Sequence, residues 1–150
     1  AQAAYGWLEL GNVEEAFAEL ERLPEELQLL PAVQAVRLDC LMAVKDWNAA
    51  VKLAQVLCGQ WAEEPGLWLH HAYAARRCAG GSIEAAYELL APCVERFPEE
   101  WLIPYNVACY LCQMERLDEA RAMLEMARSK GGGRVDTMAK DDEDLAPLNL

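Results

Sequence analysis

Four segments of this 150-residue chain are similar to one another, and their even spacing constrains the fold more than any other feature of the sequence. They are GNVEEAFAEL (11–20), KDWNAAVKLA (45–54), GSIEAAYELL (81–90) and ERLDEARAML (115–124). Each has a turn, then a large apolar residue, then an alanine three positions further: Val13 and Ala16, Trp47 and Ala50, Ile83 and Ala86, Leu117 and Ala120. The alanines are 34, 36 and 34 residues apart, so the chain consists of repeated units.

Apolar periodicity predicts two helices in each unit. In the fourth unit, apolar residues recur at three- and four-residue steps before the turn at 115–116 and again after it, as they do on one face of a helix. The alanine is small enough to let the paired helices approach closely. Pro24, Pro65 and Pro98 fall between units, where a proline ends one helix pair.

These features make the chain resemble the tetratricopeptide repeat (TPR) family over about residues 3–131. The TPR unit of 34 residues carries the pattern W-x2-L-G-x2-Y, A-x3-F and P. The fourth unit matches it at Val107, Ala108, Leu111, Ala120 and Leu124, and the third at Trp68, Ala72, Ala86, Leu90 and Pro98 if the loop CAGGS (78–82) holds two extra residues. The resemblance implies an all-α, right-handed superhelical solenoid of antiparallel helix pairs, with units at about 1–30 (truncated), 31–65, 66–98 and 99–130.

Residues 131–150 are expected to form a glycine linker followed by an acidic capping segment, because the last helix pair of a solenoid has no neighbour. Leu145, Leu148 and Leu150 could pack back against that pair. The acidic run 141–144 lacks the glycine and the ligand spacing of an EF-hand loop, which disfavours a calcium site.

The net charge of -12 argues against nucleic acid as a partner, since phosphate binding needs a basic surface. The charge is uneven: residues 1–30 carry -6, whereas residues 66–98 are neutral and would have to supply any preference for an acidic ligand. Charges interrupt every apolar stretch, so no membrane insertion is expected. The chain starts at Ala1, which leaves open whether repeats or a signal peptide preceded it.

The six cysteines lie in apolar helical segments, which favours reduced, buried thiols in a cytoplasmic protein. Cys109 and Cys112 have the C-x-x-C spacing. Close helix packing is the favoured interpretation, a zinc site with His70 or His71 is a weaker alternative, and a redox pair is weaker still because the motif lies within a helix. We predict no cofactor and no enzyme activity, because nucleophile–base pairs and phosphate loops are missing from the sequence.

Function is therefore expected from shape. The resemblance implies a scaffold or adaptor that binds a peptide or helix in a concave groove lined by the first helix of each unit. The predicted groove residues are Asp39, Met42, Leu69, Tyr73, Arg76, Arg77, Tyr105, Asn106, Cys109 and Cys112. Tyr73 and Tyr105 could equally be packing residues, and Arg76 and Arg77 could be solvated. Asn106 alone matches the carboxylate clamp of some TPR proteins, which disfavours chaperone tails as partners.

A structural role by self-association is the alternative function. The truncated first unit would leave an apolar edge at Tyr5, Trp7 and Leu8, which could meet an upstream repeat or a second copy of the chain.

Overall fold

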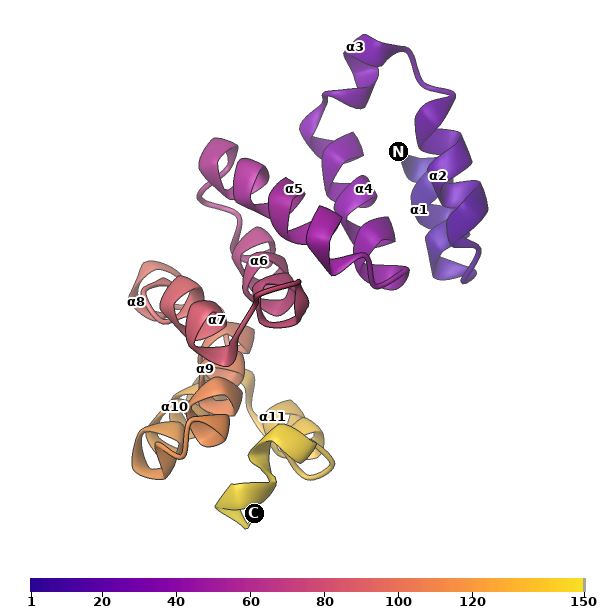
Figure 1. Ribbon diagram of the computed structural model, residues 1–150. Coiled ribbons are helices and arrows are strands. Elements are labelled where there is room, and N and C mark those ends of the chain that lie inside the picture. The colour runs from indigo at the N-terminus through magenta and orange to yellow at the C-terminus, as the bar shows by residue number, and fades with distance from the viewer. Residues whose placement is uncertain (150) are drawn as a thin grey trace.

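The computed structural model describes residues 1–149, and every regular element in that range is a helix, which confirms the all-α class (Figure 1). The elements are α1 (Gln2–Glu9), α2 (Val13–Glu21), α3 (Glu25–Gln28), α4 (Pro31–Ala43), α5 (Trp47–Gln60), α6 (Pro65–Arg77), α7 (Ile83–Leu90), α8 (Cys93–Arg96), α9 (Leu102–Gln113), α10 (Leu117–Gly131), α11 (Gly133–Ala139) and a final 3₁₀ helix, η1 (Glu143–Leu148). None of the helices in residues 1–149 has the length and hydropathy of a membrane span.

The helices follow one another along the molecule in chain order, from α1 and α2 at one end to α11 and η1 at the other (Figure 1). Each main helix packs on the next: α1 on α2, α4 on α5, α5 on α6, α6 on α7, α7 on α9 and α9 on α10. The arrangement is similar to that of helical repeats, in which a unit contacts chiefly its sequence neighbours.

The second helix of each unit begins at the apolar residue that the repeat predicts: Val13, Trp47, Ile83 and Leu117. In three units the preceding side chain caps the helix by accepting a hydrogen bond from a backbone N–H, as Asn12 does from Glu15, Asp46 from Ala49 and Ser82 from Ala85. Arg116 precedes the fourth such helix and makes no side-chain cap. There, Asp118 and Glu119 lie in the first turn, where the helix dipole favours negative charge.

The turn between paired helices recurs in detail in three of the four units. Gly11, Lys45 and Glu115 adopt left-handed backbone conformations with φ of 76°, 60° and 59°. In each turn, that residue and the next donate N–H bonds back to the ending helix, which is the Schellman pattern of helix termination. The longer loop 78–82 replaces this turn in the third unit, with Gly80 at a φ of 74°.

The core forms three apolar clusters along the chain, and the repeat alanines lie within them. Ala16, Ala50, Ala86 and Ala120 are all fully buried. A larger side chain at these positions would push the paired helices apart. The third cluster is the largest, because α9 is buried on most sides by α7, α10 and η1.

The C-terminal region differs from the expected glycine linker. Gly131 ends α10 and is buried, and Gly133 begins α11, whose Val135 and Ala139 are also buried. A Cβ at position 131 would lie 2.6 Å from Cγ2 of Val135 and 3.0 Å from the Trp101 ring. Close packing, rather than flexibility, therefore explains glycine at this position.

Apart from tyrosines and cysteines, His71 on α6 is the one buried polar side chain among residues 1–149, and its Nδ1 has no hydrogen-bond partner there. Burial lowers the pKa of this imidazole from 6.5, because the charged form would lose its hydration. The unfolded chain takes up the proton as the pH falls below about 6.5, while folded His71 resists it. Protonation of His71 therefore leaves the free energy of unfolding unchanged above that pH and lowers it as the pH falls below that value.

We expect His71→Leu to raise the free energy of unfolding by about 1 kcal/mol near pH 5.5 and by less near pH 7.5, since the variant removes both an unpaired polar group and its protonation cost. Urea unfolding of the wild type and the variant at both pH values measures the difference. If the gain is the same at both, the pKa of His71 is not lowered by folding.

Candidate interaction surface

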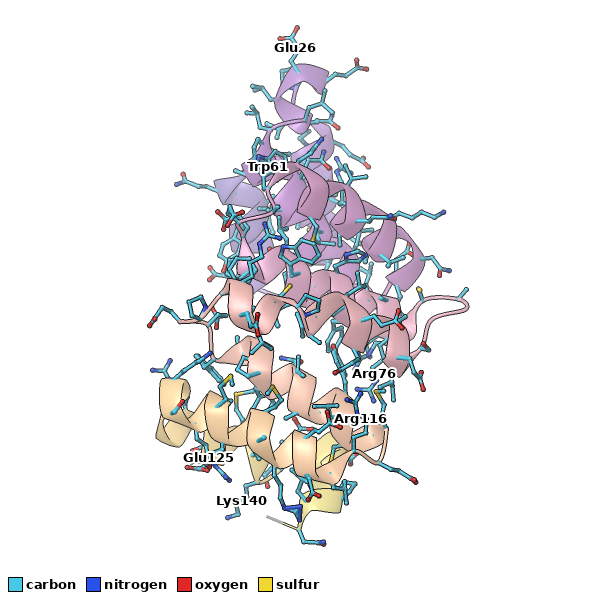
Figure 2. The ribbon with its side chains drawn as sticks, turned by 90° about the vertical axis from the view of Figure 1, so that its left-hand side faces the viewer. Glu26, Trp61, Arg76, Arg116, Glu125 and Lys140 are labelled. Carbon is cyan, nitrogen blue, oxygen red and sulfur yellow. The ribbon has the colours of Figure 1, made fainter. Side chains whose placement is uncertain are left out.

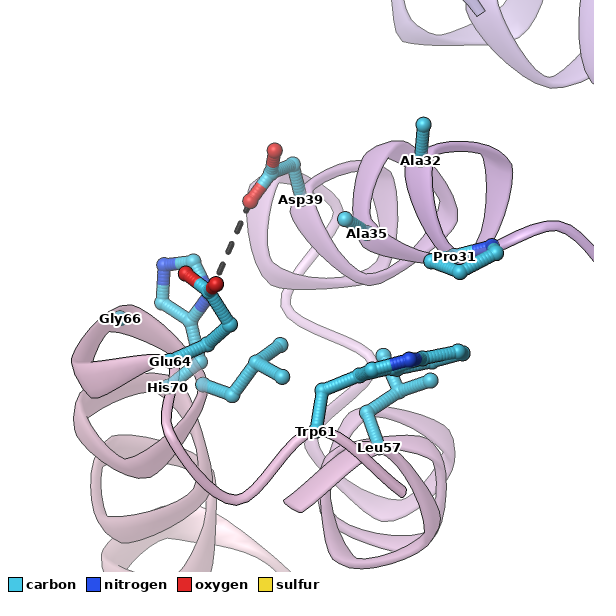
Figure 3. Close-up of a pocket in the computed structure, with 10 residues that line it drawn as sticks. Pro31, Ala32, Ala35, Asp39, Leu57, Trp61, Glu64, Gly66 and His70 are labelled. Atoms are coloured by element: carbon cyan, nitrogen blue, oxygen red, sulfur yellow. Dashed lines mark ion pairs between the residues drawn. The ribbon is translucent and has the colours of Figure 1, made fainter.

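A cavity of about 380 Å³ lies between α4, α5 and α6, and it is the clearest candidate binding site (Figure 3). Its apolar part is formed by Pro31, Ala32, Ala35, Leu57, Trp61 and Leu67. Its polar groups are Asp39 on α4, His70 on α6 and Glu64, which precedes α6. We refer to this site as the α4–α6 cavity.

Local sequence places each part of this cavity. Pro31 and Pro65 occupy the first turns of α4 and α6, where proline is tolerated, and so both helices begin beside the cavity. Trp61 follows the last residue of α5, and Figure 3 shows its indole edge-on, with Leu57 on one side and the cavity toward α4 on the other. Small residues at 32, 35 and 66 leave the space open.

A carboxylate and an imidazole face each other across the two first helices. Asp39 Oδ1 lies 3.7 Å from Nδ1 of His70 (dashed line in Figure 3). Burial raises the pKa of Asp39, and the neighbouring His70 partly offsets that rise. Glu64 is exposed and takes part in none of the ion pairs within residues 1–149.

The predicted groove residues divide into three sets. Asp39, Tyr73 and Arg77 keep exposed surface, with the Arg77 guanidinium 3.4 Å from the centre of the Tyr73 ring. Met42 and Leu69 are half-buried against the core. The remaining residues are engaged within the protein: Arg76, Tyr105, Asn106, Cys109 and Cys112.

The partner of four of these engaged residues is the chain's own C-terminal segment, residues 141–148. Arg76 pairs with both carboxylate oxygens of Asp144, one of them at 2.9 Å. The Tyr105 hydroxyl donates to Asp142 at 2.7 Å, and the Cys109 thiol contacts the same oxygen at 3.7 Å. Cys112 is buried in the cluster that contains Leu145 and Leu148. The position of Leu150 lies outside the described residues.

The pKa shifts of these residues are consistent with the hydrogen bonds and the ion pair that they form. Burial, with the hydrogen bond to Asp142, raises the pKa of Tyr105, and burial raises that of Cys109. Both groups stay protonated at neutral pH and can donate to the carboxylate. The Arg76 guanidinium lowers the pKa of Asp144 below 3.8.

Asparagine at position 144 is expected to loosen the C-terminal segment, because it removes a charge-assisted, two-point contact with Arg76. Backbone amide exchange over residues 143–149 should become about tenfold faster at neutral pH. Exposed Glu143→Gln is the matched control and should leave the exchange unchanged.

The stability difference between wild type and Asp144→Asn should also depend on pH. The pKa of Asp144 is lower in the folded state, so the contribution of the ion pair is present above about pH 3.8 and is lost as the pH falls through the folded value. Equal exchange in Asp144→Asn and Glu143→Gln would show that the ion pair does not hold the segment.

The structure does not bring together the residues of the zinc alternative. No group of three or more His, Cys, Asp or Glu side chains within residues 1–149 is arranged to hold a metal ion. His70 faces Asp39 and Cys109 faces Asp142, on different helix pairs. All six cysteines are free thiols, and five are buried.

Sequence reasoning missed three features of this surface. Trp61 and Glu64 lie between helices, outside the helical positions that the repeat aligns. An aromatic residue close to two acids in a connecting loop was nevertheless a usable signal of a binding site. Sequence reasoning also missed the partner of Arg76, which is 68 residues away in the chain.

No protein-family model matches the chain, and no curated protein matches it at a significant level.

Proposed function

We propose that this protein is an interaction scaffold or adaptor of the TPR type, a right-handed superhelical array of antiparallel helix pairs that binds a peptide or helix of another protein in its groove. The α4–α6 cavity is the observation that carries the proposal, because it lies between the first helices of two successive units and combines apolar walls with a few polar groups. The recurring turns, caps and buried alanines support the TPR assignment. Five buried thiols support a cytoplasmic location.

Selection of short random peptides by the wild-type protein tests this proposal. We expect enriched peptides that bind the wild type at least about tenfold more tightly than an Ala35→Phe variant, whose ring fills the α4–α6 cavity. Ala32→Tyr fills the cavity from an exposed position of α4, so it provides a second test if the first variant does not fold. If folded variants of both kinds bind every enriched peptide as well as the wild type does, the cavity is not the binding site.

Self-association is a second candidate function, favoured by exposed apolar side chains on α1 and directly after it. Tyr5 is 48% exposed, Trp7 37% and Leu10 78%, whereas Leu8 is half-buried against the first cluster. An edge of this kind fits a second copy of the chain. Light scattering over a range of concentrations should then show a dimer that Trp7→Lys abolishes, and a concentration-independent monomer would exclude this role.

A further inference from the structure

The α4–α6 cavity has acidic groups at its opening and apolar groups in its floor. Asp39 and Glu64 line it together with His70, and no Lys or Arg side chain does so. Asp39 has only the His70 imidazole nearby, at 3.7 Å, and Glu64 has no ionic partner within residues 1–149. A cation brought by a ligand would find two carboxylates without a strong counter-charge.

The Trp61 indole adds a second attraction for such a cation. It lines the same cavity as Asp39 and Glu64, beside Leu57 (Figure 3), and Leu67 belongs to the same lining. Lys and Arg side chains lay their apolar stems on such surfaces while their charged ends reach polar groups, and the face of an indole attracts cations. The cavity volume of about 380 Å³ falls in the range of ligand sites, with space for an apolar neighbour.

The rest of the same helix face carries one arginine, Arg77, which has no carboxylate partner within residues 1–149. Gly66, His70, Tyr73 and Arg77 recur at three- and four-residue steps on α6 and span about 16 Å at 1.5 Å per residue. Arg77 at the far end is stacked on Tyr73, and its neighbour Arg76 is paired with Asp144. Trp61 and Arg76 lie well apart along the molecule in Figure 2.

The far end of this face is acidic as well. An open hollow there is lined by Arg76, Arg77 and Tyr105 together with Asp141, Asp142, Glu143 and Asp144. The C-terminal segment therefore pairs with Arg76, one of the two predicted groove arginines, and it adds acidic groups beside Arg77. Carboxylates outnumber arginines at both ends of the face, and this excess favours a basic partner over an acidic one.

From this distribution of charge we infer that the α4–α6 cavity takes a basic, apolar segment of a partner protein, with a Lys or Arg side chain laid over Trp61 and its charged end between Asp39 and Glu64. The inference rests on the proposed groove function and names the chemistry of its ligand. An apolar residue beside the cation fills the space toward Leu57, Leu67 and Pro31.

The test uses the random-peptide selection on the wild-type protein, followed by affinity measurements with the enriched peptides. Peptides that depend on the cavity should be enriched in Lys or Arg next to an apolar residue relative to the unselected library. Asp39→Asn combined with Glu64→Gln should weaken their binding by about three- to tenfold, and added salt should weaken binding to the wild type more than binding to this variant. Glu88→Gln, an exposed carboxylate on α7 away from the cavity, is the control and should have no effect.

Three results are distinguishable. Basic peptides that lose affinity in the Asp39→Asn/Glu64→Gln variant support the inference. If the peptides that lose affinity for the Ala35→Phe variant are neutral or acidic, the inference of a basic ligand is wrong, and the proposed groove function is still supported. If no peptide distinguishes the wild type from folded Ala35→Phe and Ala32→Tyr, the proposed function fails and the inference fails with it.

Discussion

Alanine at position 81 is expected to lower the free energy of unfolding by about 3 kcal/mol, although the change adds a single methyl group to a surface loop. A Cβ there would lie 2.1 Å from the backbone oxygen of Ala75 and 2.9 Å from that of Cys78. Backbone atoms of a helix end cannot rotate away as a side chain can. The loop must therefore open, which breaks the Gly81 N–H bond to Cys78 and shifts the start of α7.

Thermal unfolding measures this effect, and a decrease of about 6–12 °C in Tm is expected for a chain of this size. Gly59→Ala is the matched control, since Gly59 is exposed near the end of α5 with no atom near its added Cβ. That variant should be slightly stabilised, by about 0.5–1 kcal/mol, because alanine has the higher helix propensity. Equal Tm values for the two variants would contradict the loop geometry.

The contrast between these two glycines illustrates what the sequence could predict. Repetition located the local features: the starts of α2, α5, α7 and α10, the burial of the alanines, and the extra length of the loop that contains Gly81. These features depend on residues within one helix pair, so a pattern of 34 to 36 residues is sufficient to place them.

The contacts of the C-terminal segment could not be predicted in the same way. Asp142 meets Tyr105 across 37 residues, and Asp144 meets Arg76 across 68. The segment lies outside the repeat, and any of its four consecutive acids could have faced any basic residue. The same limit applies to the candidate site, for which periodicity predicted Asp39 but not Trp61 or Glu64.

Alanine at position 145 is expected to cost about 2–5 kcal/mol of stability, because Leu145 is 1% exposed within the third apolar cluster and its removal leaves a cavity beside α9. Leu29→Ala is the control: Leu29 is 75% exposed, and its truncation should change the free energy of unfolding by less than about 0.5 kcal/mol. Urea unfolding measures both variants.

The double variant Leu145→Ala/Asp144→Asn shows whether the C-terminal segment docks as one unit. Burial of Leu145 and the ion pair with Arg76 hold the same short segment. If one substitution already detaches the segment, part of the other contact is lost with it, and the second substitution has less left to remove. The losses in the free energy of unfolding of the two single variants should therefore add up to more than the loss in the double variant. Strict additivity would mean that the two contacts act independently, and a Leu145→Ala effect as small as that of Leu29→Ala would mean that the segment is not docked in solution.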